Sequence, residues 1–114
     1  MPMIRVETNQ PVADGSVAAF LADLSRLAAS ALGKPEAYVM VSLDAGRAML
    51  FAGTDAPAAY VEVKSIGLQR AQTAPLSQAL SGFLRERLGV DPSRVYIEFA
   101  AAEGAMWGWN GGTF

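Results

Sequence analysis

Apolar residues recur at helical spacing in two stretches of the chain, residues 16–32 and residues 73–88. This spacing gathers them on one face, which predicts two amphipathic helices. The apolar stripes consist of Val17, Phe20, Leu21, Leu24, Leu27, Ala28 and Ala31 in the first stretch and of Leu76, Leu80, Phe83, Leu84 and Leu88 in the second. Asp14 or Ser16 can cap the first helix. Both stretches are followed by a glycine and then a proline, residues that end helices.

The two halves of the chain share one register. Leu76 follows Phe20 by 56 positions, and five further pairs repeat that interval without a gap. These pairs are Leu24 and Leu80, Leu27 and Phe83, Leu32 and Leu88, Gly33 and Gly89, and Val39 and Val95. The pattern indicates a single domain of two duplicated units, roughly residues 1–57 and 58–114. The alternative is that any two amphipathic helices ending at a glycine can be aligned in this way.

Strand patterns flank both helices, at residues 2–8, 38–43, 59–65 and 94–100. Each half therefore has the order strand, helix, strand, and a helical crossover joins parallel strands. The predicted fold class is α+β. We expect a two-layer sandwich made of two βαβ units in pseudo-twofold repeat, with a four-stranded mixed sheet and both helices on one face.

Alternation along the last two strands assigns their side chains to the two faces of the sheet. Val61 and Val63 in one strand and Ile97 in the other are expected to face the helices. Tyr96 and Glu98 then lie on the opposite face. That face needs a second cover, which favours an oligomer.

The last segment, residues 104–114 (GAMWGWNGGTF), is too aromatic for a flexible tail. The Asn-Gly dipeptide at 110–111 is typical of a tight hairpin turn. Trp107, Trp109 and Phe114 can be packing residues, and their clustering among glycines also fits the wall of a pocket.

Composition narrows the possible chemistry. The chain has 114 residues, 52% of them apolar, a formal net charge of −2, and neither Cys nor His. This excludes thiol, zinc-finger and imidazole chemistry, predicts no metal site, and leaves Asp, Glu, Lys, Tyr or the terminal amine as acid or base.

No basic cluster and no apolar run near the roughly 18 residues of a membrane span are present, so neither nucleic acid nor a membrane is an expected partner. No signal peptide is recognisable, so a cytoplasmic protein is expected, with leaderless export as the alternative.

Pro2 stands at the start of the first predicted strand, directly after Met1. Proline donates no hydrogen bond to a ladder, so the first position of a strand suits it and a structural role explains it. Removal of Met1, which is usual before a small residue, would instead leave Pro2 as a secondary amine at the chain terminus. In a protein without His or Cys, such an amine is a candidate base near neutral pH.

Several stretches match a known family in order and spacing. They are MPMIRVETNQP, LGKPEAYVMV, FAGTDAPA, SIG, FLRERLGVDPSRVYIEF and GWNGGTF. With Pro2, Lys34, Ile66 and Tyr96 at the family's spacing, the chain resembles the macrophage migration inhibitory factor family of the tautomerase superfamily. The resemblance spans nearly the whole chain.

The resemblance implies a homotrimer with sites at the subunit interfaces, and cofactor-independent keto–enol tautomerisation of phenylpyruvate-like 2-oxo acids or dopachrome-type compounds. By the family pattern, Pro2 is the base after removal of Met1. Lys34 and the backbone N–H of Ile66 hold the substrate's oxygens, and Tyr96 comes from the neighbouring subunit. The other pocket positions that the family pattern implies are Met3, Tyr38, Lys64, Ser65, Trp107, Trp109 and Phe114.

Elementary electrostatics supports a base at this position. Burial of the Pro2 amine beside Met3 and Ile66 would disfavour its charged form, and a nearby Lys34 ammonium would do so again. Both effects lower the pKa of the amine. Lys34 would also complement a developing enolate. Simpler roles stay open: Lys34 as a solvated charge after a helix, Tyr96 as sheet packing, and Ile66 as core.

Some positions depart from the family pattern. Glu98 stands where the family has Asn, and its carboxylate could repel an anionic substrate or act as an extra acid. Ala58 and Val61 replace the CxxC pair of some animal members, so thiol oxidoreductase activity does not carry over. Val12 replaces an arginine linked to receptor binding. Two alternatives stay open: a non-catalytic interaction or signalling protein that retains the scaffold, and covalent iminium chemistry at Pro2.

Overall fold

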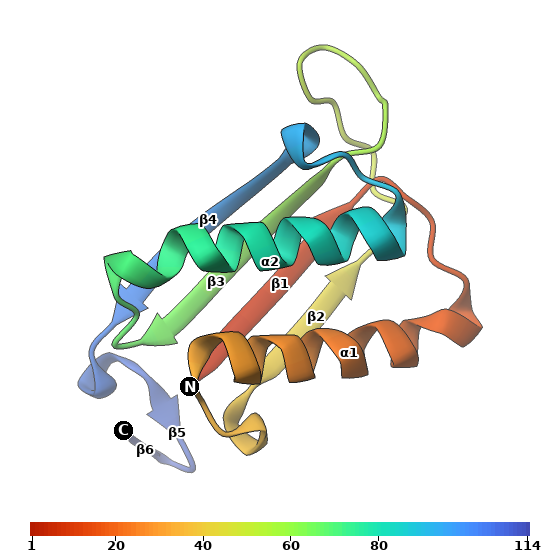
Figure 1. Ribbon diagram of the computed structural model, residues 1–114. Coiled ribbons are helices and arrows are strands. Elements are labelled where there is room, and N and C mark those ends of the chain that lie inside the picture. Colours follow the sequence, from red (N-terminus) through yellow and green to blue (C-terminus); the bar gives the residue numbers. More distant parts are fainter.

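The main sheet of the computed structural model, which describes residues 1–114, has four strands in the order β2-β1-β3-β4. The strands are β1 (Pro2–Thr8), β2 (Met40–Asp44), β3 (Ala59–Ile66) and β4 (Val95–Ala102). β1 runs parallel to β2 and antiparallel to β3, and β3 runs parallel to β4. Helices α1 (Asp14–Leu32) and α2 (Arg70–Leu88) both cover one face of this sheet (Figure 1). The predicted α+β sandwich with a mixed sheet is confirmed.

Each helix presents a buried stripe to the sheet. The stripes are Phe20, Leu24, Ala28 and Leu32 in α1 and Leu76, Leu80, Leu84 and Leu88 in α2. They meet the buried side chains of β1 and β3, including Ile4, Val61 and Val63, and together these form the core. Both helices end at a glycine in the left-handed conformation, Gly33 with φ of 64° and Gly89 with φ of 68°.

The start of α1 differs from the prediction. Ala13 is the N-cap and no side chain makes a capping hydrogen bond, so neither Asp14 nor Ser16 caps this helix. Asp14 lies in the first turn instead, where its negative charge interacts favourably with the helix dipole. Ala31 is exposed rather than part of the stripe, because Leu32 continues the four-residue spacing of the buried positions.

α1 is also long and apolar enough, by length and composition, to cross a membrane, although it contains no uninterrupted apolar run of that length. The core helix of a globular protein passes the same test of length and composition. The stripe of α1 packs on the sheet, and Arg26 and Asp23 form an ion pair on its partly exposed side. These are features of the core helix of a globular protein.

α2 begins ahead of the predicted residue 73, because a capping interaction extends it backwards. The Gln69 N–H donates to Gln72 Oε1 at 2.9 Å, which satisfies a backbone donor that the first turn leaves free. Helical structure therefore starts at Arg70, and Pro75 lies inside the helix with its ring exposed.

Charged and polar side chains occupy the face of the sheet that the helices leave open. Arg5 Nη2 lies 3.0 Å from Glu62 Oε1, and Lys64 Nζ lies 3.7 Å from Glu62 Oε2. The hydrogen bond from Arg5 is the main reason that the pKa of Glu62 lies below its usual value. Tyr96 is 67% exposed, as expected for a side chain on the uncovered face.

The C-terminal segment is an ordered hairpin of β5 (Gly108–Trp109) and β6 (Gly112–Thr113). Asn110 and Gly111 between them have φ of 52° and 77°, the positive values that a type I′ turn requires. The predicted Asn-Gly turn is confirmed. The hairpin lies beside the N-terminus of the chain (Figure 1).

Candidate active site at the start of strand β1

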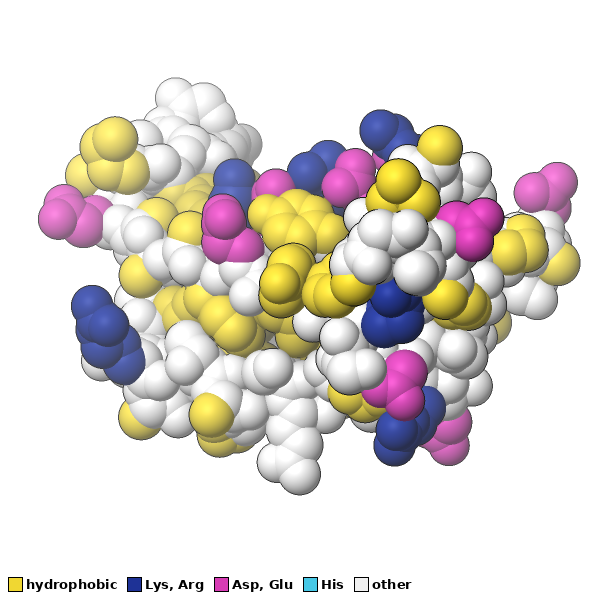
Figure 2. All heavy atoms as spheres, turned by 90° about the horizontal axis from the view of Figure 1, so that it is seen from above, with side chains coloured by type: hydrophobic (Ala, Val, Ile, Leu, Met, Phe, Trp, Pro, Cys, Tyr) yellow, Lys and Arg dark blue, Asp and Glu magenta, His cyan; other side chains and the backbone are white.

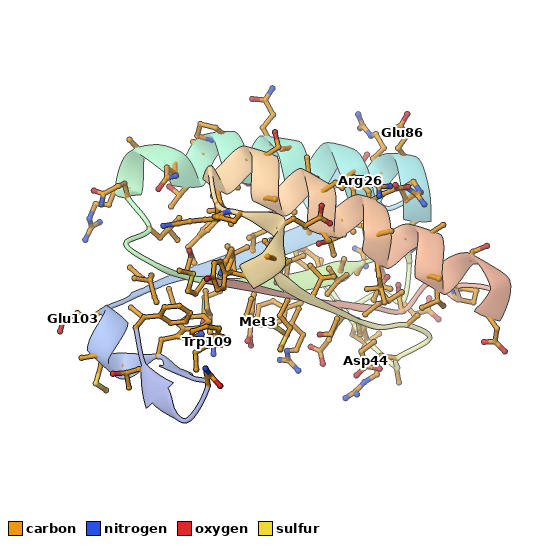
Figure 3. All side chains as sticks on the ribbon, turned by 90° about the horizontal axis from the view of Figure 1, so that it is seen from below. Met3, Arg26, Asp44, Glu86, Glu103 and Trp109 are labelled. Atoms are coloured by element: carbon orange, nitrogen blue, oxygen red, sulfur yellow. The ribbon has the colours of Figure 1, made fainter.

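A cavity of about 240 Å³ lies where β1 begins. Its walls come from the start of β1, the segment that leads into β2, and the C-terminal hairpin. The lining residues are Met1, Pro2, Met3, Ala37, Tyr38, Val39, Met40, Trp107, Gly108, Trp109 and Phe114. Figure 3 shows Met3 and Trp109 at this end of the sheet and Asp44 at the other end.

Three aromatic rings form one wall of the cavity. Trp109 and Phe114 stack with ring centroids 5.3 Å apart and an interplanar angle of 17°. Tyr38 meets both rings edge-on, at 5.7 Å and 5.8 Å. The Phe114 N–H donates to the Trp107 carbonyl at 3.2 Å, which folds the last residue back onto the hairpin. The wall is therefore held by its own hydrogen bond and by favourable ring geometry.

The chain terminus lies in an electrostatic environment that disfavours positive charge. Pro2 is fully buried. Burial first, and the Lys34 ammonium second, lower the pKa of the Met1 amino group from its ordinary value. The left-handed Gly33 turns the chain after α1, and the Lys34 N–H donates to the Ala29 carbonyl at 3.0 Å. The helix end thus directs Lys34 toward the terminus, although its side chain does not line the cavity.

The end of β3 lies next to Pro2. Ser65 is opposite Pro2, and Lys64 is opposite Met3 in the antiparallel ladder. Ser65 is fully buried, whereas Lys64 is exposed and paired with Glu62. Ile66 ends the strand. Ser65, Lys64 and Ile66 therefore adjoin the cavity without forming its wall.

Tyr96 and Glu98 lie elsewhere in the chain. Tyr96 is aligned with Tyr60 near the start of β3, whereas Pro2 is aligned with Ser65 near its end. About 16 Å of strand separates the two positions. Glu98 is exposed, forms no ion pair, and stands opposite Glu62 in the middle of the sheet. One chain alone does not bring these two residues to the cavity.

Tyr96 lines a second, apolar hollow of about 410 Å³ at the far end of the sheet. The other lining residues are Met49, Leu50, Phe51, Ala52, Ala59 and Tyr60. Figure 2 looks onto this end of the molecule and shows apolar side chains gathered between charged ones. The ring of Tyr96 packs on Phe51 with centroids 4.7 Å apart.

Besides Met1, four cavity residues were not among the predicted site residues: Ala37, Val39, Met40 and Gly108. Met40 stands opposite Met3 in the parallel ladder, so only the pairing of β1 with β2 brings it to the cavity. The other three neighbour predicted residues in sequence, and that adjacency was the only available signal. No group of Asp or Glu side chains lies close enough together to hold a metal ion.

The chain matches a family model, related proteins and solved structures. A family model described as macrophage migration inhibitory factor (MIF) matches residues 1–114. Macrophage migration inhibitory factor of Mus musculus is 41% identical, with 100% of this chain and 99% of the relative covered. A homolog from Trichuris trichiura is 39% identical, with both chains covered completely.

Solved structures agree with these matches. The structure of a macrophage migration inhibitory factor homologue from Prochlorococcus marinus superposes with a TM-score of 0.93 at 41% identity, covering 98% of both chains. The macrophage migration inhibitory factor from Trichinella spiralis superposes with a TM-score of 0.89 at 32% identity, covering 98% of this chain and 99% of that one.

Proposed function

The chain belongs to the macrophage migration inhibitory factor family, whose fold is that of the tautomerase superfamily, and from this premise we propose a cofactor-independent keto–enol tautomerase. The proposed substrates are phenylpyruvate-like 2-oxo acids or dopachrome-type compounds. The position of the chain terminus carries the proposal. The Met1 amino group at this terminus lies beside Pro2 in an apolar, aromatic cavity, and burial and Lys34 both lower its pKa.

In the proposed reaction, the secondary amine of Pro2 takes a proton from the carbon next to the substrate carbonyl. The electron pair of the broken C–H bond forms the enolate, and the Pro2 ammonium then gives its proton to the enolate oxygen, which regenerates the base. The same steps in reverse convert enol to keto. The same burial and the same Lys34 charge that lower the pKa of the Met1 amino group would act on the Pro2 amine once Met1 is removed, and they favour the unprotonated form that a base requires. Lys34 and the Ile66 N–H stabilise the negative charge on oxygen, and the aromatic wall packs against the substrate's apolar part.

This role depends on removal of Met1. While Met1 is attached, the nitrogen of Pro2 is an amide and has no basic lone pair. Chains that begin at Met1 and chains that begin at Pro2 are therefore expected to differ in activity although all other residues are identical.

The test compares those two forms, separated and identified by intact mass, in the enol-to-keto conversion of phenylpyruvate and hydroxyphenylpyruvate. Only the chain beginning at Pro2 is expected to be active. Pro2→Gly should lose most of this activity, whereas Pro11→Gly, which removes an exposed proline after β1, should retain it. Equal rates for Pro2→Gly and the unaltered chain would contradict a role for Pro2.

We also propose a homotrimer whose sites lie at the subunit interfaces. Family membership supports it, and so do the exposure of Tyr96 and its distance from Pro2 within one chain. In this arrangement Tyr96 and Glu98 of one copy approach the cavity of another, and the substrate is a small molecule bound between them.

The alternative is a non-catalytic interaction or signalling protein. The unpaired carboxylate of Glu98 favours it, because a negative charge at the site would repel a 2-oxo acid. An intact oligomer whose chains begin at Pro2 and that turns over none of phenylpyruvate, hydroxyphenylpyruvate or dopachrome would support this alternative.

Borohydride trapping with substrate separates base catalysis from iminium formation at Pro2, because only the iminium leaves a covalent adduct detectable by mass.

A further inference from the structure

The side chain of Arg94 binds main-chain carbonyls of the loop between β2 and β3. It ends the short helix η2 (Pro92–Arg94), directly before β4. Its guanidinium donates to four carbonyl oxygens: Pro57 from Nε at 2.9 Å, Phe51 from Nη1 at 3.1 Å, and Thr54 and Ala56 from Nη2 at 3.2 Å and 3.0 Å. Figure 1 shows η2 and this loop at the same end of the sheet, opposite the terminal hairpin.

The loop contains a strained turn. Phe51 and Thr54 exchange backbone hydrogen bonds of 3.0 Å and 3.1 Å, and between them Ala52 and Gly53 have φ of 53° and 75°. Glycine adopts such a backbone freely, but alanine does so at a steric cost because of its Cβ. A strained turn persists only where its surroundings hold it in place. Arg94 bonds the carbonyls at both ends of this turn, which makes it the side chain that holds the turn.

The Phe51–Thr54 turn also supports the side chain of Tyr96. The Arg94 guanidinium lies 5.2 Å from the centroid of the Phe51 ring, within cation–π range. The same ring packs on Tyr96 at 4.7 Å with an interplanar angle of 50°. Tyr60 stands beside Tyr96 in the ladder, and the side chain of Tyr96 is largely exposed, so the packing of Phe51 on its ring helps to set its orientation. A continuous line of contacts therefore runs from Arg94 through Phe51 to Tyr96.

We propose that Arg94 is a positioning residue, which holds the Phe51 turn so that Tyr96 is presented in one orientation to the active site of a neighbouring copy. This inference rests on the proposed function, in which Tyr96 completes another subunit's site. A planar guanidinium is needed because an ammonium cannot serve several carbonyls in a fixed fork.

The kinetic test uses Arg94→Gln and Arg94→Lys, with Arg26→Gln as the control that removes an exposed arginine from α1. Arg94→Gln should lower kcat/KM about tenfold or more, since small misplacements of site groups are costly. Arg94→Lys should recover only part of the loss. In a Tyr96→Ala background, Arg94→Gln should cause little further loss, because its effect passes through Tyr96. Equal fold losses in both backgrounds, with the trimer intact by light scattering, would overturn the proposal.

A readout independent of activity uses fluorotyrosine and ¹⁹F NMR, because the chain has only three tyrosines. The Tyr96 resonance should move in Arg94→Gln, while the resonance of Tyr38, in the aromatic wall at the other end, should stay in place. Phe51→Leu removes the ring that links Arg94 to Tyr96 and should move the same resonance, so it carries the test if Arg94→Gln does not fold. An unaltered chain without tautomerase activity refutes the proposed function alone. A Tyr96 resonance that stays unchanged in these variants refutes the positioning role.

Discussion

At the residue scale, Lys34 affects the terminal amine through its positive charge. It follows the glycine that ends α1, and its ammonium is the second cause, after burial, of the lowered pKa of the terminal amine. In the proposed enzyme the Pro2 amine takes this place after removal of Met1, and its unprotonated form is the active one. A lower pKa therefore keeps more of the amine unprotonated at lower pH. Loss of the Lys34 cation should reverse part of this effect.

Lys34→Ala should move the acid limb of the pH profile of kcat/KM to higher pH, because the terminal amine regains a higher pKa. At neutral pH it should lower kcat/KM by about tenfold to a hundredfold, since a group that stabilises the enolate is lost as well. Arg70→Ala, which removes an exposed cation at the start of α2, should leave the profile in place. Coinciding acid limbs for Lys34→Ala and the unaltered chain would show that Lys34 does not tune the base.

Ala52 is a second residue with a local effect, because its positive φ strains the backbone of the Phe51–Thr54 turn. Ala52→Asn should raise the free energy of unfolding by about 0.5–1 kcal/mol, because Asn tolerates positive φ and Asn-Gly suits such a turn. The chain already uses that dipeptide at 110–111. Denaturant unfolding measures the change, and Ala48→Asn, an exposed alanine of the same loop, is the control expected within about 0.5 kcal/mol of the unaltered chain. A destabilised Ala52→Asn would contradict the strain assigned to this turn.

At the scale of elements, the C-terminal hairpin completes the cavity. The hairpin returns to the start of β1 because the chain from Glu103 to Trp107 makes a single tight turn, with the Trp107 N–H donating to the Gly104 carbonyl at 3.1 Å. A Cβ at Gly104 would lie 2.8 Å from the Phe114 carbonyl oxygen, closer than packed atoms allow. The absence of a side chain at Gly104 therefore sets where the aromatic wall stands.

Gly104→Ala should displace Phe114 and raise KM roughly threefold to tenfold with little change in kcat, because in the proposed reaction the wall binds substrate without taking part in proton transfer. The control is Gly82→Ala in α2, where a Cβ meets nothing within 4 Å. It should leave the kinetics unchanged and stabilise the helix by about 0.5–1 kcal/mol. An unchanged KM in Gly104→Ala would mean that the wall does not contact substrate.

At the scale of the whole molecule, the proposed site is divided, because one chain holds Pro2 and Tyr96 at opposite ends of its sheet. The cavity with Pro2 lies at one end, and Tyr96 with its apolar hollow lies at the other. Antiparallel pairing of β1 with β3 and parallel pairing of β3 with β4 enforce this separation. In the proposed site, the two residues can therefore meet only between copies.

Mixing two impaired variants tests this directly. Pro2→Gly chains and Tyr96→Ala chains, unfolded together in equal amounts and refolded, should recover about a quarter of the unaltered rate, because that share of sites in random trimers receives Pro2 from one copy and Tyr96 from its neighbour. Each variant refolded alone is the control. No recovery in verified mixed oligomers would place both residues in the same chain's site, or Tyr96 outside it.

Most of the fold could be predicted because its signals are local. The helical stripes, the alternation of Val61 and Val63, the terminating glycines and the Asn-Gly turn each depend on a few neighbouring residues. The helix starts were predicted less well. Ala13 caps α1 without a side-chain bond, and the Gln69–Gln72 pair that extends α2 is a weaker signal than Ser, Thr or Asp.

Residue pattern and composition were enough to predict the element order, the two faces of the sheet, the absence of thiol and imidazole chemistry, and the candidacy of Pro2. The folded structure was needed to show which distant residues meet. It brings Met40 to Met3, lets Lys34 act on the terminal amine, separates Tyr96 from Pro2, and joins Arg94 to the Phe51 turn. The physical reason is that periodicity reports which face a side chain occupies, whereas contacts across strands depend on pairing and register, which no short stretch of residues specifies.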